Sequence, residues 1–335
     1  MTRIALDAMG GDHAPQETVR GALDAAARGV DVVLVGDEAR LRPLLAQCHA
    51  DLPIVHAPEA IGMGDDVSAA IRDKRRSSIS VAARLVAEGE AAGLVSAGST
   101  GATVAAGVIL VGRAPGVSRP ALAAIFPVGH PTVVLDVGAN LEVRPEHLVQ
   151  FAVMGRVLAQ VYLGADDPAV GLLNIGEEEG KGRPLEKEAY ALLAAARLHF
   201  VGNVEGRDLG RGTADVFVTD GFTGNVALKV SEGLADAMLS MLKREIMSNV
   251  FSKIGFFFLK RSLKRIKKKL DYAEYGGALL LGVNGIVIIG HGSSNAKAIK
   301  NAVYLSYKFI SQKVLQKISL EIEKTQISLP ELKHV

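Results

Sequence analysis

The sequence predicts an α/β fold built around a largely parallel sheet. Short apolar runs alternate with helical patterns along the 335 residues, as they do where helices connect parallel strands. Aromatic residues make up 5% of the chain and tryptophan is absent, so small aliphatic side chains must fill the core, as strands buried on both faces require. Loops that combine glycine with polar residues follow most of the strands, where open α/β sheets bind ligands.

The expected strands are short runs of β-branched and other aliphatic residues. They cover residues 4–6, 32–35, 54–56, 94–95, 132–135, 170–173, 200–201, 216–218 and 286–289. Helical patterns lie between them, where apolar residues recur three or four positions apart. The expected helices cover residues 38–48, 67–92, 226–241, 246–270 and about 296–324, and segments that include Val19, end near Val111 or begin at Pro145.

Composition restricts the class of protein. Apolar residues make up 49% of the chain, which is enough for a full core. The single Cys48 cannot form an internal disulfide, and the lack of a cysteine cluster argues against zinc and favours a reducing compartment. The first residues are too few for a signal peptide, and no apolar run reaches the roughly 18 residues of a membrane span. We therefore expect a soluble, cytoplasmic protein.

The most informative segment is residues 215–225, which read Asp-Val-Phe-Val-Thr-Asp-Gly-Phe-Thr-Gly-Asn. An apolar strand, a glycine turn and a helix start follow one another, an order that can direct free backbone N–H groups at an anion. Gly221 and Gly224 would permit positive φ and close approach of a ligand, and Thr223 and Asn225 would add a hydroxyl and an amide. The alternative is an ordinary strand-to-helix turn with a capped helix.

Similar polar glycine loops follow at least five of the strands. If the strands are parallel, these loops lie at one edge of the sheet and form one cleft that binds anions. The candidate phosphate-binding residues are Gly10, Gly11, Asp12, Ser99, Thr100, Gly101, Asn140, Asp220, Gly221, Thr223, Gly224, His291 and Ser293.

The familiar signatures of other ligands are missing. No Gly-x-Gly-x-x-Gly follows the first strand, and residues 176–182 are one residue short of a P-loop. No Gly-x-Ser-x-Gly elbow is present, because Ser99 lies in Gly-Ser-Thr-Gly. The remaining groups, Lys181, Arg207, His13 and His291 with the loop N–H groups, suit a small anion such as phosphate and a transition state that gains negative charge. Lys181 is the leading catalytic candidate because it stands between glycines after a strand; a surface or capping role is the alternative for the others.

A strongly cationic segment interrupts a chain whose net charge is only +2. Residues 243–271 carry ten Lys or Arg against two acidic residues, which gives +8 and leaves −6 for the remainder. Apolar residues lie at helical spacing beside these cations, and Gly255 is expected between two helices. We interpret the segment as inserted amphipathic helices that contact a membrane through Ile254, Phe256, Phe257, Phe258, Lys260 and Arg261.

Other interpretations of this segment remain open. It could be a core or dimer-contact helix pair with a solvated basic face, or it could meet an acidic protein. Nucleic acid is disfavoured, because the rest of the chain is acidic and no known binding motif is present.

Several motifs resemble those of the bacterial PlsX-type phosphate acyltransferases. They are residues 7–15, 96–101, 135–140, 215–225, 275–277 and 291–294, which together span nearly the whole chain. The resemblance implies a three-layer α/β/α fold with one large, mostly parallel mixed sheet, like that of isocitrate and isopropylmalate dehydrogenases and phosphotransacetylases. It implies one catalytic domain of two intertwined lobes over residues 1–327, with residues 243–271 inserted; residues 328–335 are expected to be a frayed tail.

The resemblance also implies an activity. Members of the family transfer a fatty acyl group from acyl carrier protein to inorganic phosphate, and the acyl phosphate enters phospholipid synthesis. They use no nicotinamide cofactor, form homodimers and touch the cytoplasmic membrane through a helical tip, here residues 246–265. Lys181 and Asn225 match residues implicated in catalysis, whereas Ser99 replaces an asparagine found in many members. His13 is a weaker candidate for proton transfer, and no metal is required.

Two alternatives remain open. One is a nicotinamide-linked decarboxylating dehydrogenase of the same fold, and the other is a non-catalytic membrane scaffold that recruits enzymes of lipid synthesis.

Overall fold

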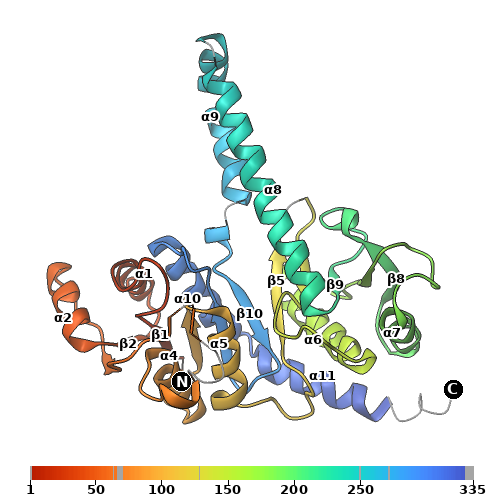
Figure 1. Ribbon diagram of the computed structural model, residues 1–335, viewed down its shortest axis with the longest axis horizontal. Helices are drawn as coiled ribbons and strands as arrows, with labels where there is room; N and C mark the ends of the chain where they lie inside the picture. The colour runs from red at the N-terminus through yellow and green to blue at the C-terminus, as the bar shows by residue number, and fades with distance from the viewer. Residues whose placement is uncertain are drawn as a thin grey trace.

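The computed structural model describes residues 2–62, 64–65, 71–127, 129–248, 250–270 and 272–328. Within these ranges, an 11-stranded sheet has the order β3-β2-β1-β4-β11-β10-β5-β6-β9-β7-β8 (Figure 1). The strands are β1 (Ile4–Asp7), β2 (Val32–Gly36), β3 (Ile54–His56), β4 (Gly93–Ser96), β5 (Ala121–Phe126), β6 (Thr132–Leu135), β7 (Val170–Asn174), β8 (Phe200–Glu205), β9 (Val216–Val218), β10 (Ala278–Leu281) and β11 (Ile286–Ile289).

All the expected strands are present, but β5 and β10 were not predicted. Their sequences, Ala-Leu-Ala-Ala-Ile-Phe and Ala-Leu-Leu-Leu, are rich in residues that favour helices, so local propensity does not indicate strands. Both become strands because they are buried in the middle of the sheet. They also decide its topology, since β10 is antiparallel to β11 and β5, and β5 is antiparallel to β6.

The main helices are α1 (Gln16–Ala26), α2 (Glu38–Gln47), α4 (Ser78–Ala87), α5 (Thr100–Ala106), α6 (Pro145–Leu163), α7 (Pro184–Ala195), α8 (Gly221–Met247), α9 (Val250–Leu270), α10 (Ala296–Ser311) and α11 (Val314–Ser328). The single helix expected over residues 296–324 is wrong, because Lys313 has a φ of 55° and separates α10 from α11. Of the helix expected over residues 67–92, residues 67–70 lie outside the described part, and α4 occupies only residues 78–87. The predicted frayed tail also lies outside, apart from Ser328, which ends α11.

The two halves of the sheet run in opposite directions and meet at one lateral row of residues. Pairing across the strands places in this row Leu6, Val95, Ile288, Leu279, Ala123, Leu135 and Val218. The strands β1, β4 and β11 end one residue beyond the row, whereas β6 and β9 arrive from the other side and end at it. The expectation that all polar loops share one edge is therefore wrong; the two sets of loops leave the middle of the sheet in opposite directions.

Helices cover both faces of the sheet, so the fold has three layers. On one face α1, α2, α6, α7, α10 and α11 contribute to a large apolar core, for example through Leu41, Phe151 and Ile318. The other face packs mainly against α4 and the α5 segment, through residues such as Ile79 and Ala106. Fewer helices cover this second face, and the candidate site lies there.

The helices α8 and α9 pack on each other and project from the body of the protein (Figure 1). The α8 stripe, which we define as Val226, Val230, Leu234, Met238 and Met241, is between 47% and 66% exposed, so it does not face the core. Gly255 lies inside α9 and not between two helices, because α8 ends at Met247 and α9 begins at Val250. Among the described residues, we find no helix with the length and hydrophobicity of a bilayer span.

Candidate active site

A cavity of about 450 Å³ opens on the less covered face of the sheet. Its floor comes from β5 and the adjoining ends of β10 and β11, one wall from the loops after β1, β4 and β11, and the other wall from α8. The lining includes Asp12, Gly98, Thr100, Leu122, Ala124, Phe126, Asn225, Leu228, Lys229, Glu232, Ala235, Tyr275, Ala278, Ile289 and His291. The tertiary structure thus brings Asp12, Thr100 and His291 together with Asn225, which comes from the opposite half of the sheet.

The loops after β1 and β4 are held together by Asp7. Its carboxylate accepts hydrogen bonds from the hydroxyl of Ser96 (2.7 Å) and the N–H of Met9 (3.1 Å). The Ser96 hydroxyl in turn accepts the N–H of Gly98 at 3.1 Å. Burial raises the pKa of Asp7, against the effect of these hydrogen bonds. A Cβ at Gly10 would lie 2.5 Å from the Asp7 carboxylate and 2.8 Å from the Gly98 nitrogen, so glycine is required where the two loops touch.

The loop after β11 joins this wall through its backbone. The N–H of Asp12 donates to the carbonyl of Gly292 at 2.8 Å. The Nδ1 atom of His291 lies 2.8 Å from the Ser293 hydroxyl, and the Ser293 N–H points at the same nitrogen at 3.2 Å. This turn orients the imidazole of His291 at the cavity, whereas Ser293 supports it from outside the lining.

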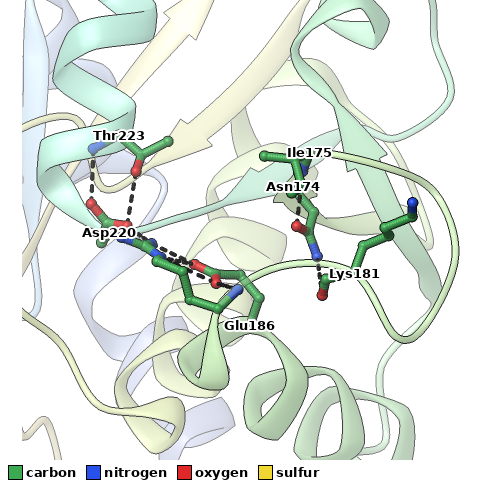
Figure 2. A network of polar contacts seen from close by, with 7 residues as sticks. Asn174, Ile175, Lys181, Glu186, Asp220 and Thr223 are labelled. Atoms are coloured by element: carbon green, nitrogen blue, oxygen red, sulfur yellow. Dashed lines mark hydrogen bonds and ion pairs between the residues drawn. The ribbon is translucent and has the colours of Figure 1, made fainter.

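The first turn of α8 is capped from within the protein. Asp220 accepts the N–H of Thr223 at 2.8 Å and its hydroxyl at 2.9 Å, and Arg183 lies 2.5 Å from the same carboxylate (Figure 2). Burial by itself would raise the pKa of Asp220, but the hydrogen bonds from Thr223 and Arg183 outweigh it and lower the pKa. The N–H groups of Gly221 and Gly224 donate to the carbonyls of Asn140 and Asp220. Three of the N–H groups expected to face an anion at this helix start, those of Gly221, Thr223 and Gly224, are therefore engaged within the protein.

Gly221 and Gly224 are required by the packing of α8 on its neighbours, and the positive φ expected of them is absent. Neither has a positive φ, and both are buried in the first turn of α8. A Cβ on Gly221 would lie 2.5 Å from the Asn140 carbonyl oxygen, and one on Gly224 would lie 1.9 Å from that of Asp136. Both glycines let α8 touch the loop after β6, which brings Asn225 within 3.7 Å of a Cβ built on Gly138.

Asn140 is also structural. It is 8% exposed, and its amide donates to the Pro120 carbonyl at 2.7 Å and to Asp136 at 2.8 Å. Asp136 accepts further N–H groups from Leu122, Gly138 and Asn140 itself. Burial raises the pKa of Asp136, against these donors.

Lys181 lies on a separate loop, outside the cavity lining. Asn174 closes this loop by accepting the N–H of Ile175 at 2.8 Å and donating to the Lys181 carbonyl at 3.1 Å. The Lys181 side chain is 51% exposed, with Nζ 3.8 Å from Glu178. Figure 2 shows it extending away from Asp220 and Thr223.

The remaining predicted residues lie in or near the loops of the first wall. Ser99 accepts the N–H of Ala102 at 3.4 Å and caps α5, where Gly101 is exposed. Gly10 and Ser99 line a much smaller hollow, of about 10 Å³, beside Asp7. Gly11 has a φ of +106° at the turn, and His13 is exposed and lies outside the cavity lining.

Arg207 is engaged by carboxylates. It pairs with Glu205, and it lies 3.5 Å from Glu177. Glu177, Glu205 and Asp208 bring oxygens within 4.8 Å of one another, the spacing of a metal site among the described residues. Arg207 and Arg211 pair with all three and offset two of the three negative charges.

Sequence reasoning identified Asn225 but missed the rest of the α8 wall and the floor. The wall residues Asn225, Leu228, Lys229, Glu232 and Ala235 follow helical spacing from Asn225, so the rule that residues three or four apart share a face could have found them. The sequence analysis of this helix followed the α8 stripe, which lies on the neighbouring face. The floor was missed because β5 was not recognised as a strand.

Comparisons with known proteins agree with the fold and identify relatives. Residues 2–317 match a family model described as "Fatty acid synthesis protein". The phosphate acyltransferase of Trichlorobacter lovleyi is 49% identical over 327 residues, covering 96% of this chain and 95% of the relative. The phosphate acyltransferase of Nitratidesulfovibrio vulgaris is 50% identical over 323 residues, covering 95% and 94%.

Solved structures share the fold at low identity. A phosphotransacetylase from Streptococcus pyogenes superposes with a TM-score of 0.62 at 18% identity, over 92% of this chain and 94% of that chain. A 4-hydroxythreonine-4-phosphate dehydrogenase from Klebsiella pneumoniae gives 0.54 at 15% identity, over 94% and 100%. The predicted α/β architecture with a large mixed sheet is thereby confirmed.

Proposed function

The chain belongs to the fatty acid synthesis protein family and is an enzyme of the phosphate acyltransferase type, as its relatives are; from this premise we propose that it transfers a fatty acyl group from an acyl carrier protein thioester to inorganic phosphate. The product would be an acyl phosphate for phospholipid synthesis. The observation that carries the proposal is the cavity, where polar groups from both halves of the sheet stand over an apolar floor. Such a site suits an anion next to a hydrophobic chain.

The reaction needs no nucleophile from the protein. An oxygen of phosphate attacks the thioester carbonyl carbon, forming a C–O bond while the carbonyl electrons move to its oxygen. Collapse of the tetrahedral oxyanion breaks the C–S bond, and the proton of the attacking hydrogen phosphate goes to the leaving thiolate. The protein contributes position and charge.

Roles follow from what lines the cavity. We assign Asn225 and Thr100 to orienting phosphate by hydrogen bonds, and His291 to the negative charge that develops. Lys229 is paired with Glu232 at 2.9 Å, which keeps its ammonium group beside α8. His13 is retained as a weaker candidate for proton transfer.

Lys181 is proposed to act from the neighbouring loop. Among the residues that the structure describes, its Nζ pairs with a 72% exposed Glu178 carboxylate at 3.8 Å, and such an exposed pair contributes little, about 0–1 kcal/mol. The ammonium group is thus free to exchange this partner for a phosphate or thioester oxygen when substrate binds.

The projecting helices α8 and α9, which we call the hairpin, are proposed to serve association with a membrane and with a second copy of the chain. Phe251, Phe257 and Phe258 are 86%, 74% and 78% exposed, and Lys260 and Arg261 are exposed beside them. Exposed aromatic residues with adjacent cations are typical of helices that lie at an anionic membrane surface. The exposed α8 stripe would be buried by a second copy of the chain in a homodimer, because contiguous apolar surface of this kind marks an interface.

The function is tested by mixing the purified protein with palmitoyl-acyl carrier protein and inorganic phosphate and trapping the product with hydroxylamine. Palmitoyl hydroxamate should form only when protein, thioester and phosphate are all present. Release of free palmitate at the same rate with and without phosphate would identify a thioesterase and reject the proposal.

A further inference from the structure

The cavity extends beyond the polar residues assigned to phosphate. Resting on the proposed function, we propose that its apolar part, between β5, the start of β10 and α8, holds the acyl chain of the donor. We further propose that Ala124, Ala278 and Ala235 set the length of chain that fits.

The floor consists of apolar side chains that are nearly buried even without a ligand, since Leu122, Ala124 and Phe126 are 4%, 8% and 6% exposed. Side chains alternate along β5, so Leu122, Ala124 and Phe126 face the cavity while Ala121 and Ala123 enter the opposite core. Elsewhere on this face the strands pack against α4 and the α5 segment. Over β5 the cavity is bounded by α8, which projects from the body of the protein (Figure 1). An apolar ligand would fill the space between this floor and α8.

The floor is deep because two alanines stand side by side. Leu279 pairs with Ala123 in antiparallel register, so the next pair along the two strands is Ala278 with Ala124. Both alanines line the cavity, and Ile289 lies across from Ala278 on the other side. Larger side chains at these positions would occupy the space that the floor leaves open.

The α8 wall gives the cavity its length and its direction. Asn225 and Ala235 both line it and are ten positions apart, so the wall extends about 15 Å at 1.5 Å per residue. Leu228 follows Asn225 on this face, and Ala235 lies at its far end. A chain whose carbonyl carbon is beside Asn225 can therefore run along Leu228 towards Ala235, over the alanines of the floor.

The charged residues of this wall do not oppose an apolar occupant. Lys229 and Glu232 pair with each other at 2.9 Å, with side chains 53% and 36% exposed. Their heads can remain in water while their methylene stems line the cavity, as long charged side chains do elsewhere.

The test compares long and short donors in variants that fill the cavity from two independent elements. The variants are Ala124→Leu on the floor and Ala235→Leu on the half-buried wall, and the donors are palmitoyl and butyryl thioesters of acyl carrier protein with inorganic phosphate. Each variant should lower the ratio of kcat/KM for palmitoyl to that for butyryl by about tenfold or more, the effect of one misplaced methylene or more in a fitted pocket.

Matched controls separate filling from other effects. Ala124→Ser preserves the size of the floor residue, and Ala237→Leu adds the same side chain to an exposed position of α8 outside the lining; both should leave the ratio within about twofold of the parent. If Ala124→Leu does not fold, Ala235→Leu still tests the acyl-chain site. Ala235 lies on a partly exposed helix face, where a larger side chain is tolerated.

The outcomes distinguish this inference from the function on which it rests. Acyl phosphate from both donors with an unchanged ratio in Ala235→Leu would overturn the acyl-chain site and leave the proposed function intact. Absence of acyl phosphate from both donors with the unsubstituted protein would remove the proposed function itself.

Discussion

Gly224 of α8 touches the backbone of Asp136 so closely that a Cβ atom would lie 1.9 Å from the Asp136 carbonyl oxygen. This contact joins the start of α8 to the end of β6, and it sets where Asn225 stands in the cavity. Substitution of Gly224 therefore tests whether the placement of Asn225 depends on backbone contact.

Gly224→Ala should destabilise the protein by about 1–3 kcal/mol, because the methyl group forces one backbone segment away from another. It should also lower kcat, since Asn225 moves with the helix. Gly233→Ala is the matched control on the same helix, where a Cβ meets nothing within 4 Å; it should stabilise by about 0.5–1 kcal/mol. Chemical denaturation measures the change in stability of each variant. Equal stabilities of the two variants would contradict the close contact between Gly224 and Asp136.

Asp7→Asn should change how stability depends on pH. Burial raises the pKa of Asp7, so the folded state holds a proton that the unfolded state releases near the usual value of about 3.9. The contribution of Asp7 to the free energy of unfolding is then fully present below the pKa of the unfolded state and is lost as pH rises through the pKa of the folded state. The free energy of unfolding of the parent relative to the variant should thus fall as pH rises over that window.

Urea denaturation at several pH values measures this difference. Asp24→Asn is the control for loss of one formal charge, because Asp24 is exposed on α1. A parent-to-variant difference that stays constant or grows with pH would show that Asp7 is not held with a raised pKa.

Arg183→Met should shift acid unfolding to higher pH. In the parent, the pKa of Asp220 is lowered by its hydrogen bonds, so the stability from this carboxylate is present above the unfolded pKa and lost as pH falls through the folded pKa. Removing Arg183, which lies 2.5 Å from the carboxylate, lets burial raise that pKa. As the pH falls, this stability should then be lost at a pH nearer neutrality than in the parent. At neutral pH the variant should already be destabilised by about 1–3 kcal/mol.

An acid titration followed by circular dichroism measures the midpoint. The double variant Arg183→Met with Asp220→Asn is the informative companion, since it removes the carboxylate that Arg183 pairs with. Its acid midpoint should return towards that of the parent.

Lys181→Ala should lower turnover by about 10²–10³ without affecting the fold, as the loss of one donor to a developing oxyanion does. Its side chain is half exposed and its loop is held by the Asn174 bonds to backbone, so the melting temperature should not change. Lys187→Ala, an exposed position of α7, controls for loss of a nearby positive charge. Turnover within about threefold of the parent would exclude Lys181 from the mechanism.

Phe257→Glu combined with Phe258→Glu should abolish sedimentation with vesicles that contain anionic lipid. The two rings pack edge to face with centroids 5.6 Å apart and are largely exposed, so carboxylates there add repulsion and remove apolar contact. Leu320→Glu controls for an exposed apolar residue on α11. Cosedimentation that persists in the double variant would assign the hairpin to a protein contact instead.

The resemblance in the sequence was sufficient for the family, and the alternation of strands and helices was sufficient for the fold class. Both depend on local information. The motif at residues 215–225 predicted a strand and a helix start, and β9 and α8 fulfil these expectations. The helix is capped by Asp220, whereas the alternative interpretation expected an Asn or Thr cap. The contacts of its glycines were not predicted. Gly221 and Gly224 touch the loop after β6, and no local sequence pattern indicates which loop will be adjacent in the fold.

What the sequence by itself determined is therefore the kind of elements, the supply of polar groups at the ends of strands and the family to which the chain belongs. What only the tertiary structure decided is which of those groups meet. Two alanine- and leucine-rich strands, β5 and β10, become strands only through burial, and they reverse the direction of half the sheet. That reversal brings Asn225 to Thr100 and His291, leaves Lys181 outside the lining and places an apolar floor beneath the cavity. These placements could not be predicted, because strand pairing is a long-range interaction that local propensity does not encode.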